Sequence, residues 1–365
     1  MARIDAFLEI GRQQGGSDIH FTVGLPPLVR LDGELVPVKF RNLDADEVQS
    51  FVREILTEHH EQELERRGAT DFAYAAGSAG RFRVNVLRQR RGVAAICRVI
   101  PEEVPRLNDL GLPRVVHQFT TLTSGLVLVT GPTGTGKSTT LAAMIREIAE
   151  TRSVNIVTLE DPVEFLHRSS RSLIIQRELG TQVASFREGL RSALRQDPDV
   201  ILVGELREPE AISLALEAAE TGHLVLGTLH TRGAAQTIDR IVDAHSADHQ
   251  SQVRHSLADN LKAVVSQELI RAADGRGRRA ALEVLVLTTA VQQMVREGKT
   301  FQIPGAITTG KRLGMQLMDQ AMLQLVRAGE IDPDEAFLRA EDKWGFAPFL
   351  TRPELLAMTH GDRAA

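Results

Sequence analysis

The sequence predicts an α/β protein built around a P-loop nucleotide-binding domain. A continuous apolar run, 126–129, leads directly into the glycine-rich segment 131–139, and helical periodicity follows that segment. Beyond residue 113, short apolar runs alternate with helical segments, which predicts a parallel sheet covered by helices. The chain of 365 residues exceeds one typical domain of roughly 100 to 200 residues, so we expect a second domain.

Residues 1–99 are expected to form that smaller α/β domain. A helix is predicted over 4–13, because its periodicity stops at the pair Gly15-Gly16. Apolar alternation over 27–38 is interrupted by Asp32-Gly33, which predicts a β-hairpin. The domain is completed by helices that begin at 44 and 59 and by strands at 71–74, 81–88 and 93–99.

Residues 100–112 contain prolines and are predicted to link the two domains. The P-loop domain is expected over 113–288, with buried parallel strands at 126–130, 155–159, 200–203 and 224–228 and a strand-like run at 281–287. Helical periodicity dominates 290–339, which predicts a helical C-terminal subdomain over 289–365 with a frayed tail at 361–365.

The glycine-rich segment has the composition of a complete phosphate-binding loop. Glycines let successive backbone N–H groups turn toward phosphates, and the positive end of the following helix dipole adds to the attraction. Lys137 is expected to reach the β and γ phosphates of ATP, and the Ser138 hydroxyl is expected to bind Mg²⁺. The predicted nucleotide-binding residues are Gly131, Pro132, Thr133, Gly134, Thr135, Gly136, Lys137, Ser138 and Thr139.

Carboxylates end two of the predicted strands. Glu205 follows the run 200–203, and Gly204 stands where a magnesium-binding Asp is usual, so Glu205 is predicted to polarise the attacking water as a general base. A plain helix N-terminal Glu is the alternative. Glu160 or Asp161 could hold a metal-bound water, unless they form only an acidic turn.

Histidines bracket the strand predicted at 224–228. His230 is predicted to hydrogen-bond Glu205 or to sense the γ-phosphate, with a structural histidine as the alternative. His223 and His230 are seven residues apart, which places them on opposite faces of a regular strand and makes them a poor metal-binding pair.

Phosphoryl transfer also needs positive charge on the transferred group. Arg81 and Arg83 alternate on one face of a predicted strand, and Arg195 precedes the strand that leads to Glu205. All three are candidate catalytic arginines, with solvated surface charges as the alternative.

Composition excludes several classes of protein. The formal net charge is −5, which gives no reason to expect nucleic-acid binding. The single cysteine, Cys97, excludes an internal disulfide and a CxxC zinc module, and it is expected to be buried in a reducing compartment. No apolar run is long enough for a membrane helix, so we expect a cytoplasmic protein without membrane insertion.

At these motifs the chain resembles the secretion ATPase superfamily that powers type II secretion and type IV pili. The segment 194–207 is similar to its Walker B signature, 159–162 to its Asp box and 221–231 to its His box. Further similar segments are 16–20, 81–85, 237–241, 295–299 and 314–320. Within the superfamily, the chain is most similar to the type IV pilus retraction motors of the PilT type, which act in twitching motility.

The resemblance implies a RecA-like ATPase domain, a PAS-like N-terminal domain and a homo-hexameric ring that binds ATP and Mg²⁺ at subunit interfaces. Arg81 and Arg83 would then reach a neighbour's γ-phosphate, Glu205 would be the base, Glu160 an accessory carboxylate and His230 a γ-phosphate contact. The implied location is the cytoplasmic side of the inner membrane at the base of the pilus. The implied partners are an inner-membrane platform protein and a paralogous motor, with no nucleic acid.

Some residues depart from the family pattern without touching the phosphate machinery: Arg232, Glu208 and the segment 244–246. They leave open whether the chain is the main retraction motor or a divergent paralogue. The alternative functions are a pilus-extension or type II secretion ATPase, an ATP-sensing regulatory module and, more weakly, a DNA translocase.

Overall fold

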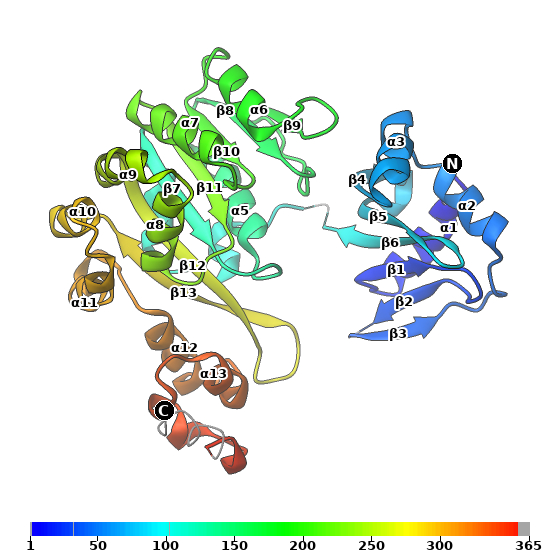
Figure 1. The fold of residues 1–365 in the computed structure, drawn as a ribbon. Helices are drawn as coiled ribbons and strands as arrows, with labels where there is room; N and C mark the ends of the chain where they lie inside the picture. Colours follow the sequence, from blue (N-terminus) through cyan, green and yellow to red (C-terminus); the bar gives the residue numbers. More distant parts are fainter. Residues whose placement is uncertain (1, 32, 102, 357–365) are drawn as a thin grey trace. The chain divides into compact units, whose positions relative to one another are not determined.

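A computed structural model describes residues 2–31, 33–101 and 103–356. The chain divides into two compact units (Figure 1). Unit 1 consists of residues 1–104, 160–166 and 178–182, and unit 2 consists of residues 105–159, 167–177 and 183–365. The boundary at 104/105 falls inside the linker expected at 100–112. The tail expected at 361–365 lies outside the described residues.

Unit 1 is a six-stranded sheet with the order β3-β2-β1-β6-β5-β4, and its paired neighbours are antiparallel. The hairpin predicted over 27–38 is present as paired β2 and β3, although Asp32 in its turn lies outside the described residues. The elements are α1 (Arg3–Gln13), β1 (Asp18–Phe21), β2 (Leu28–Leu31), β3 (Glu34–Pro37), α2 (Ala45–Arg53), α3 (Glu58–Arg67), β4 (Ala69–Ala75), η1 (Gly77–Ala79), β5 (Arg81–Gln89) and β6 (Gly92–Ile100).

The core of unit 1 lies between one face of this sheet and its helices. Alternate residues of β5, among them Phe82 and Val84, are buried against apolar side chains of α1, α2 and α3. Arg81 and Arg83 therefore project from the opposite face. Cys97 is free and fully buried in this core, and burial raises the pKa of its thiol.

Unit 2 contains a seven-stranded sheet with the order β13-β12-β7-β11-β10-β8-β9. Its elements up to the last strand are η2 (Leu107–Leu110), α4 (Val115–Thr120), β7 (Gly125–Thr130), α5 (Lys137–Thr151), β8 (Asn155–Glu160), β9 (Leu173–Glu178), α6 (Phe186–Ala193), β10 (Val200–Val203), α7 (Pro209–Glu220), β11 (Leu224–Leu229), α8 (Ala234–Asp243), α9 (Ala247–Asn260), β12 (Leu261–Arg271) and β13 (Arg278–Val286).

The centre of this sheet is parallel, as the alternation of strands and helices predicts. β7 pairs with β11 and β12, and β10 pairs with β8 and β11, all in parallel. β12 and β13 form a long antiparallel pair, so the sheet as a whole is mixed. The prediction contained neither β9 nor β12, and β12 is the direct neighbour of the P-loop strand.

The described residues beyond 288 form mainly short helices, and a further cluster of buried apolar side chains joins the later ones to β12 and β13. These elements are α10 (Thr289–Arg296), η3 (Thr300–Gln302), α11 (Ile303–Thr309), η4 (Lys311–Leu313), α12 (Met318–Arg327), α13 (Pro333–Arg339), η5 (Lys343–Gly345) and η6 (Ala347–Phe349). Phe337, Met322 and Phe346 pack together with Ile270 of β12.

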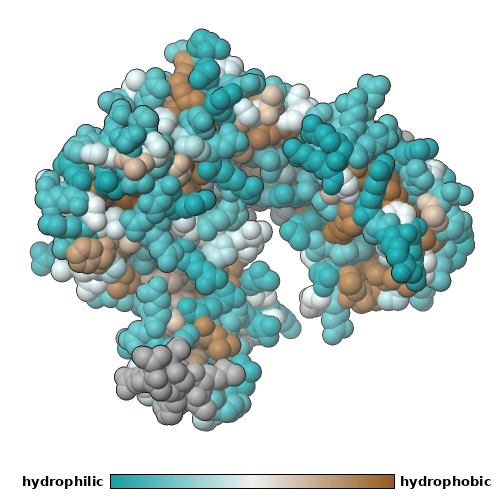
Figure 2. All heavy atoms as spheres, in the orientation of Figure 1, coloured by the Kyte–Doolittle hydropathy of each residue, from teal (hydrophilic) through white to brown (hydrophobic). Residues whose placement is uncertain are grey.

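The face of the molecule in Figure 2 is mostly hydrophilic, and its apolar side chains lie in small separate groups. Within the described ranges, no helix is both long and apolar enough to cross a membrane.

Candidate nucleotide-binding site

The P-loop connects β7 to α5 at the carboxyl end of the parallel strands of unit 2. Gly131, Gly134 and Gly136 have φ values of 142°, 81° and 87°, which L side chains rarely adopt. The Oγ1 of Thr135 donates to the carbonyl of Pro132 at 2.9 Å. The glycines therefore serve the turn itself, because other residues would be strained at these φ values.

Lys137 and Ser138, the residues expected to bind phosphate and Mg²⁺, differ in their exposure to solvent. The ammonium of Lys137 is buried and donates to the carbonyls of Gly131 and Pro132 at 2.8 and 2.9 Å. Ser138 is exposed in the first turn of α5. Both positions fit a Mg²⁺-nucleotide: Ser138 is accessible to a metal ion, and Lys137 can exchange its carbonyl partners for phosphate oxygens.

Glu205 and His230 come together at the carboxyl ends of the parallel strands, the same end at which the P-loop lies. Glu205 follows β10, His230 follows β11, and the two strands are parallel neighbours. His230 Nε2 lies 3.3 Å from Glu205 Oε1. The Glu205 carboxylate also accepts a hydrogen bond from Nε of Arg207, which had not been predicted as a site residue. The Glu205 side chain is 19% exposed, so it is accessible to solvent while its Oε1 contacts both His230 and Arg207.

Glu160 is the last residue of β8 and belongs to unit 1. Its carbonyl accepts from the N–H of Leu179 at 2.9 Å, which ties the end of β8 to the residue that follows β9. Asp161 comes next and is exposed. The segment 160–166 therefore brings several carboxylates into unit 1.

Arg81 and Arg83 contact this same segment within unit 1. Arg81 Nη2 donates to the carbonyl of Val163 at 3.3 Å, and Arg83 Nη1 lies 3.3 Å from Glu164 Oε1. Arg83 Nε is also 3.8 Å from Asp71 Oδ1 on β4. Both arginines are thus held by residues of their own chain, and Glu164 is a partner that sequence analysis did not assign.

Arg195 and His223 precede the amino ends of strands β10 and β11, away from the end where the P-loop lies. Arg195 precedes β10 and donates to the carbonyl of Arg191 at 3.1 Å, so the strand separates it from Glu205. His223 precedes β11, and its Nδ1 lies 2.9 Å from the carbonyl of Ala218. Within its own chain, the fold therefore does not bring Arg195 to the P-loop, and His223 closes a turn.

Gln267 of β12 is a further residue at the P-loop that sequence analysis missed. It is buried, and its Oε1 accepts from Thr140 Oγ1 of α5 at 2.8 Å. The available signal was a mostly apolar run, 261–265, which ends two residues before Gln267 and had not been assigned to a strand.

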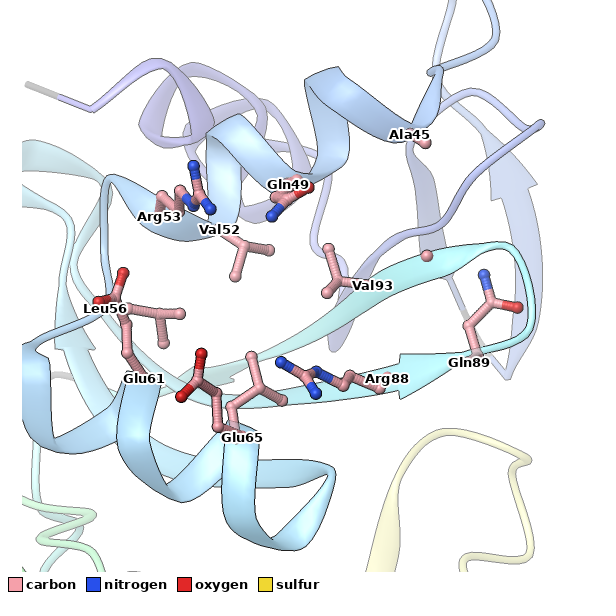
Figure 3. A pocket seen from close by; sticks show the side chains of 12 residues that line it. Ala45, Gln49, Val52, Arg53, Leu56, Glu61, Glu65, Arg88, Gln89 and Val93 are labelled. Carbon is pink, nitrogen blue, oxygen red and sulfur yellow. The ribbon is translucent and has the colours of Figure 1, made fainter.

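A separate pocket of about 550 Å³ lies in unit 1 between α2, α3 and the β5–β6 hairpin (Figure 3). Its lining combines apolar side chains, such as Val52 and Leu56, with Arg53, Glu65 and Arg88. It contains none of the residues predicted for nucleotide chemistry.

Comparison with known proteins gives consistent matches along most of the chain. The family model described as "Type II/IV secretion system protein" matches residues 4–336. The "Twitching motility protein" of Neisseria gonorrhoeae is 48% identical over 316 residues, which are 87% of this chain and 84% of that protein. The "Type IV pilus retractation ATPase PilT" of Pseudomonas aeruginosa is 44% identical over 338 residues, 93% of this chain and 98% of that protein. The solved structure "Crystal Structure of the Pilus Retraction Motor PilT and Bound ADP" has a TM-score of 0.85 and 42% identity, and the match covers 94% of this chain and 98% of that one.

Proposed function

The chain belongs to the type II/IV secretion system protein family, and we propose that it is an ATP-hydrolysing motor for type IV pilus retraction. The observation that carries the proposal is end-to-end similarity to a retraction ATPase in a chain with a complete P-loop. The relative named for twitching motility supports the same class. The resemblance predicted from the Walker B, Asp-box and His-box motifs is thereby confirmed.

Nucleotide binding is assigned to the loop from Gly131 to Thr139. Its backbone N–H groups and the N-terminus of α5 attract the phosphates, and Lys137 moves from its carbonyl partners to the β and γ oxygens. Ser138 would hold Mg²⁺, and Glu160 would contribute through a water molecule. The metal would supply positive charge to the phosphate oxygens.

Hydrolysis is assigned to Glu205 as the base that takes a proton from the attacking water. His230 and Arg207 both contact Oε1 of the Glu205 carboxylate. This arrangement orients the carboxylate, and it leaves His230 close to where a γ-phosphate contact is expected. A general base of this kind contributes typically 10² to 10⁴ in rate.

Motor work is assigned to a homo-hexameric ring in which Arg81 and Arg83 act on the nucleotide of a neighbouring subunit. Positive charge from such arginines is worth about 10³ to 10⁵ in rate. In the ring, the two arginines exchange Val163 and Glu164 for phosphate oxygens. The ring acts at the cytoplasmic side of the inner membrane on a platform protein, with a paralogous motor as a further partner.

The first experiment measures ATPase rate against protein concentration for the wild type and an Arg81→Ala variant, with the mass of each species determined alongside. We expect the rate per subunit to rise as hexamers form and to collapse in the variant without loss of the hexamer. A monomer that hydrolyses ATP at a constant rate, indifferent to Arg81, would overturn the ring assignment.

The second experiment deletes the protein in its host and counts surface pili. If the protein is a retraction motor, the deletion strain should carry too many pili. If it is an extension or secretion motor, the strain should carry no pili or an unchanged number. A stoichiometric ATP complex that does not turn over would instead identify a regulatory module. Stimulation of the ATPase by DNA would identify a translocase.

A further inference from the structure

A buried glutamine of β12 contacts both ends of the phosphate loop. Gln267 is 3% exposed, and its Oε1 accepts from Thr140 Oγ1 at 2.8 Å. Thr140 is equally buried and lies three residues beyond Lys137, in the first turn of α5. Because both partners are shielded from water, losing either one leaves the other with an unsatisfied polar group.

The same glutamine limits the space around two loop glycines. A Cβ at Gly131 would lie 2.4 Å from the backbone carbonyl oxygen of Gln267, and a Cβ at Gly136 would lie 2.9 Å from its Nε2. Gln267 therefore approaches the loop closely at its start and at its end. Its backbone limits the position of Gly131, and its side chain limits that of Gly136.

The preceding residue of β12 adds a third attachment. Ser266 Oγ lies 2.7 Å from Thr130 Oγ1, at the residue before the loop. Thr130 Oγ1 in turn accepts from Thr237 Oγ1 of α8 at 3.5 Å, and Thr237 lies 2.7 Å from Thr231, which follows His230. Side chains of β12 thus contact the residues on either side of the loop, and a line of hydroxyl groups leads from there toward His230.

We propose that Gln267 is a positioning residue for nucleotide binding, which holds the first turn of α5 against β12 while Lys137 exchanges its carbonyl partners for phosphate oxygens. The role rests on the nucleotide binding assigned above and adds a residue from outside the loop. Lys137 donates to the carbonyls of Gly131 and Pro132, so its transfer to phosphate would remove two contacts of the loop, whereas the contact between Gln267 and Thr140 would remain. A loop fixed in advance loses less conformational freedom when phosphate binds.

The test compares Gln267→Met, which keeps the unbranched shape, with Thr140→Val and with the double variant. ADP affinity is measured by calorimetry, and stability is measured by denaturant unfolding of the same full-length samples. We expect each single variant to weaken ADP binding about five- to tenfold, the worth of one hydrogen bond. The double variant should bind ADP no more weakly than the single variant with the lower affinity, because both changes remove the same contact. Thr140→Ser keeps the hydroxyl and should bind within about twofold of wild type.

The matched control is Asn155→Ala. Asn155 Nδ2 donates to the carbonyls of Gln196 and Asp197 at 2.8 and 2.9 Å, at the edge of the same sheet that lies away from the P-loop. This variant should unfold more easily and bind ADP as the wild type does.

Unchanged ADP affinity in Gln267→Met or Thr140→Val, or additive losses in the double variant, would overturn the positioning role. So would an equal loss of affinity in Asn155→Ala, which would mean that general destabilisation causes it. These outcomes can be told apart from failure of the motor proposal. A wild type that binds ADP but does not hydrolyse ATP would contradict the motor proposal and would leave the role of Gln267 unaffected.

Discussion

The imidazole Nε2 of His230 lies 3.3 Å from the carboxylate Oε1 of Glu205, each residue following one of two parallel neighbouring strands. The carboxylate also contacts Arg207, so it is oriented by its own chain before any substrate binds. Orientation of this kind is useful to a general base, because a base acts only within hydrogen-bond reach of the proton that it removes.

Replacing Glu205 by Gln should remove most of the turnover and keep ATP binding. The amide has the shape of the carboxylate but cannot accept a proton, so we expect a loss of about 10² to 10⁴ in kcat. Single-turnover hydrolysis and equilibrium ATP binding measure the two effects separately. Glu208→Gln, three residues further along, is the matched control and should retain activity. Full residual hydrolysis in Glu205→Gln would remove Glu205 as the base.

Replacing His230 by Ala should lower kcat without abolishing it. The contact orients Glu205, and one hydrogen bond is worth about 0.5 to 1.5 kcal/mol, so we expect a loss of up to about tenfold. Combining it with Glu205→Gln should add little further loss, since a misplaced base and a missing base fail at the same step. Steady-state kinetics of the single and double variants measure this, and fully additive losses would indicate an independent role for His230.

Replacing Glu164 by Gln should increase the ATPase rate of assembled protein. Glu164 and Arg83 form an ion pair at 3.3 Å with side chains about one-third exposed, and a pair of this kind is worth about 0 to 1 kcal/mol. Freeing Arg83 should therefore raise kcat by up to about fivefold. Asp71→Asn, at the other partner of Arg83, is the comparison variant. A lower rate in Glu164→Gln would instead mean that Glu164 takes part in hydrolysis.

Asp334 should stabilise the C-terminal helices in a pH-dependent way. Burial alone would raise its pKa, but hydrogen bonds from Thr351 and Arg352 outweigh burial and lower the pKa to about 2. Because the pKa is lower in the folded state, the stabilisation is present above the ordinary value of 3.8 and is lost as the pH falls toward 2.

Asp334→Asn should therefore be less stable than wild type at pH 7, by about 1 to 3 kcal/mol. The difference should shrink below pH 4. Denaturant unfolding at pH 7 and pH 3 measures both values. A difference that is equal at the two pH values would show that the charge on Asp334 contributes nothing.

Sequence analysis predicted the elements whose residues carry a strong local signal. The strand at 200–203 matches β10 residue for residue, because a wholly buried parallel strand is a continuous apolar run. β1 and β9 were missed, since Asp18 and His20 in one and Arg177 in the other interrupt the apolar pattern of a short strand. Whether such a short segment forms a strand depends on pairing with strands that are distant in sequence. Local periodicity carries no information about that pairing.

The candidate site was predictable to the same extent. Lys137 and Glu205 follow from motifs, and the contact between Glu205 and His230 follows from the shared edge of a parallel sheet. Gln267 could not be predicted, because its partner Thr140 is 127 positions away and only the pairing of β12 with β7 brings them together. Arg195 lies before the amino end of β10 and donates to the carbonyl of Arg191, a position that its nearness in sequence to Glu205 does not reveal, and its catalytic role stays a prediction.

The division of the chain into units has a mechanical consequence. The backbone passes from one unit to the other at 104/105, 159/160, 166/167, 177/178 and 182/183. Any rotation of unit 1 against unit 2 must therefore twist five backbone connections, and one of them directly precedes Glu160. A cut in the linker 100–112 would leave four connections intact, so a fragment lacking residues 1–104 would carry segments 160–166 and 178–182 without the side chains that bind them.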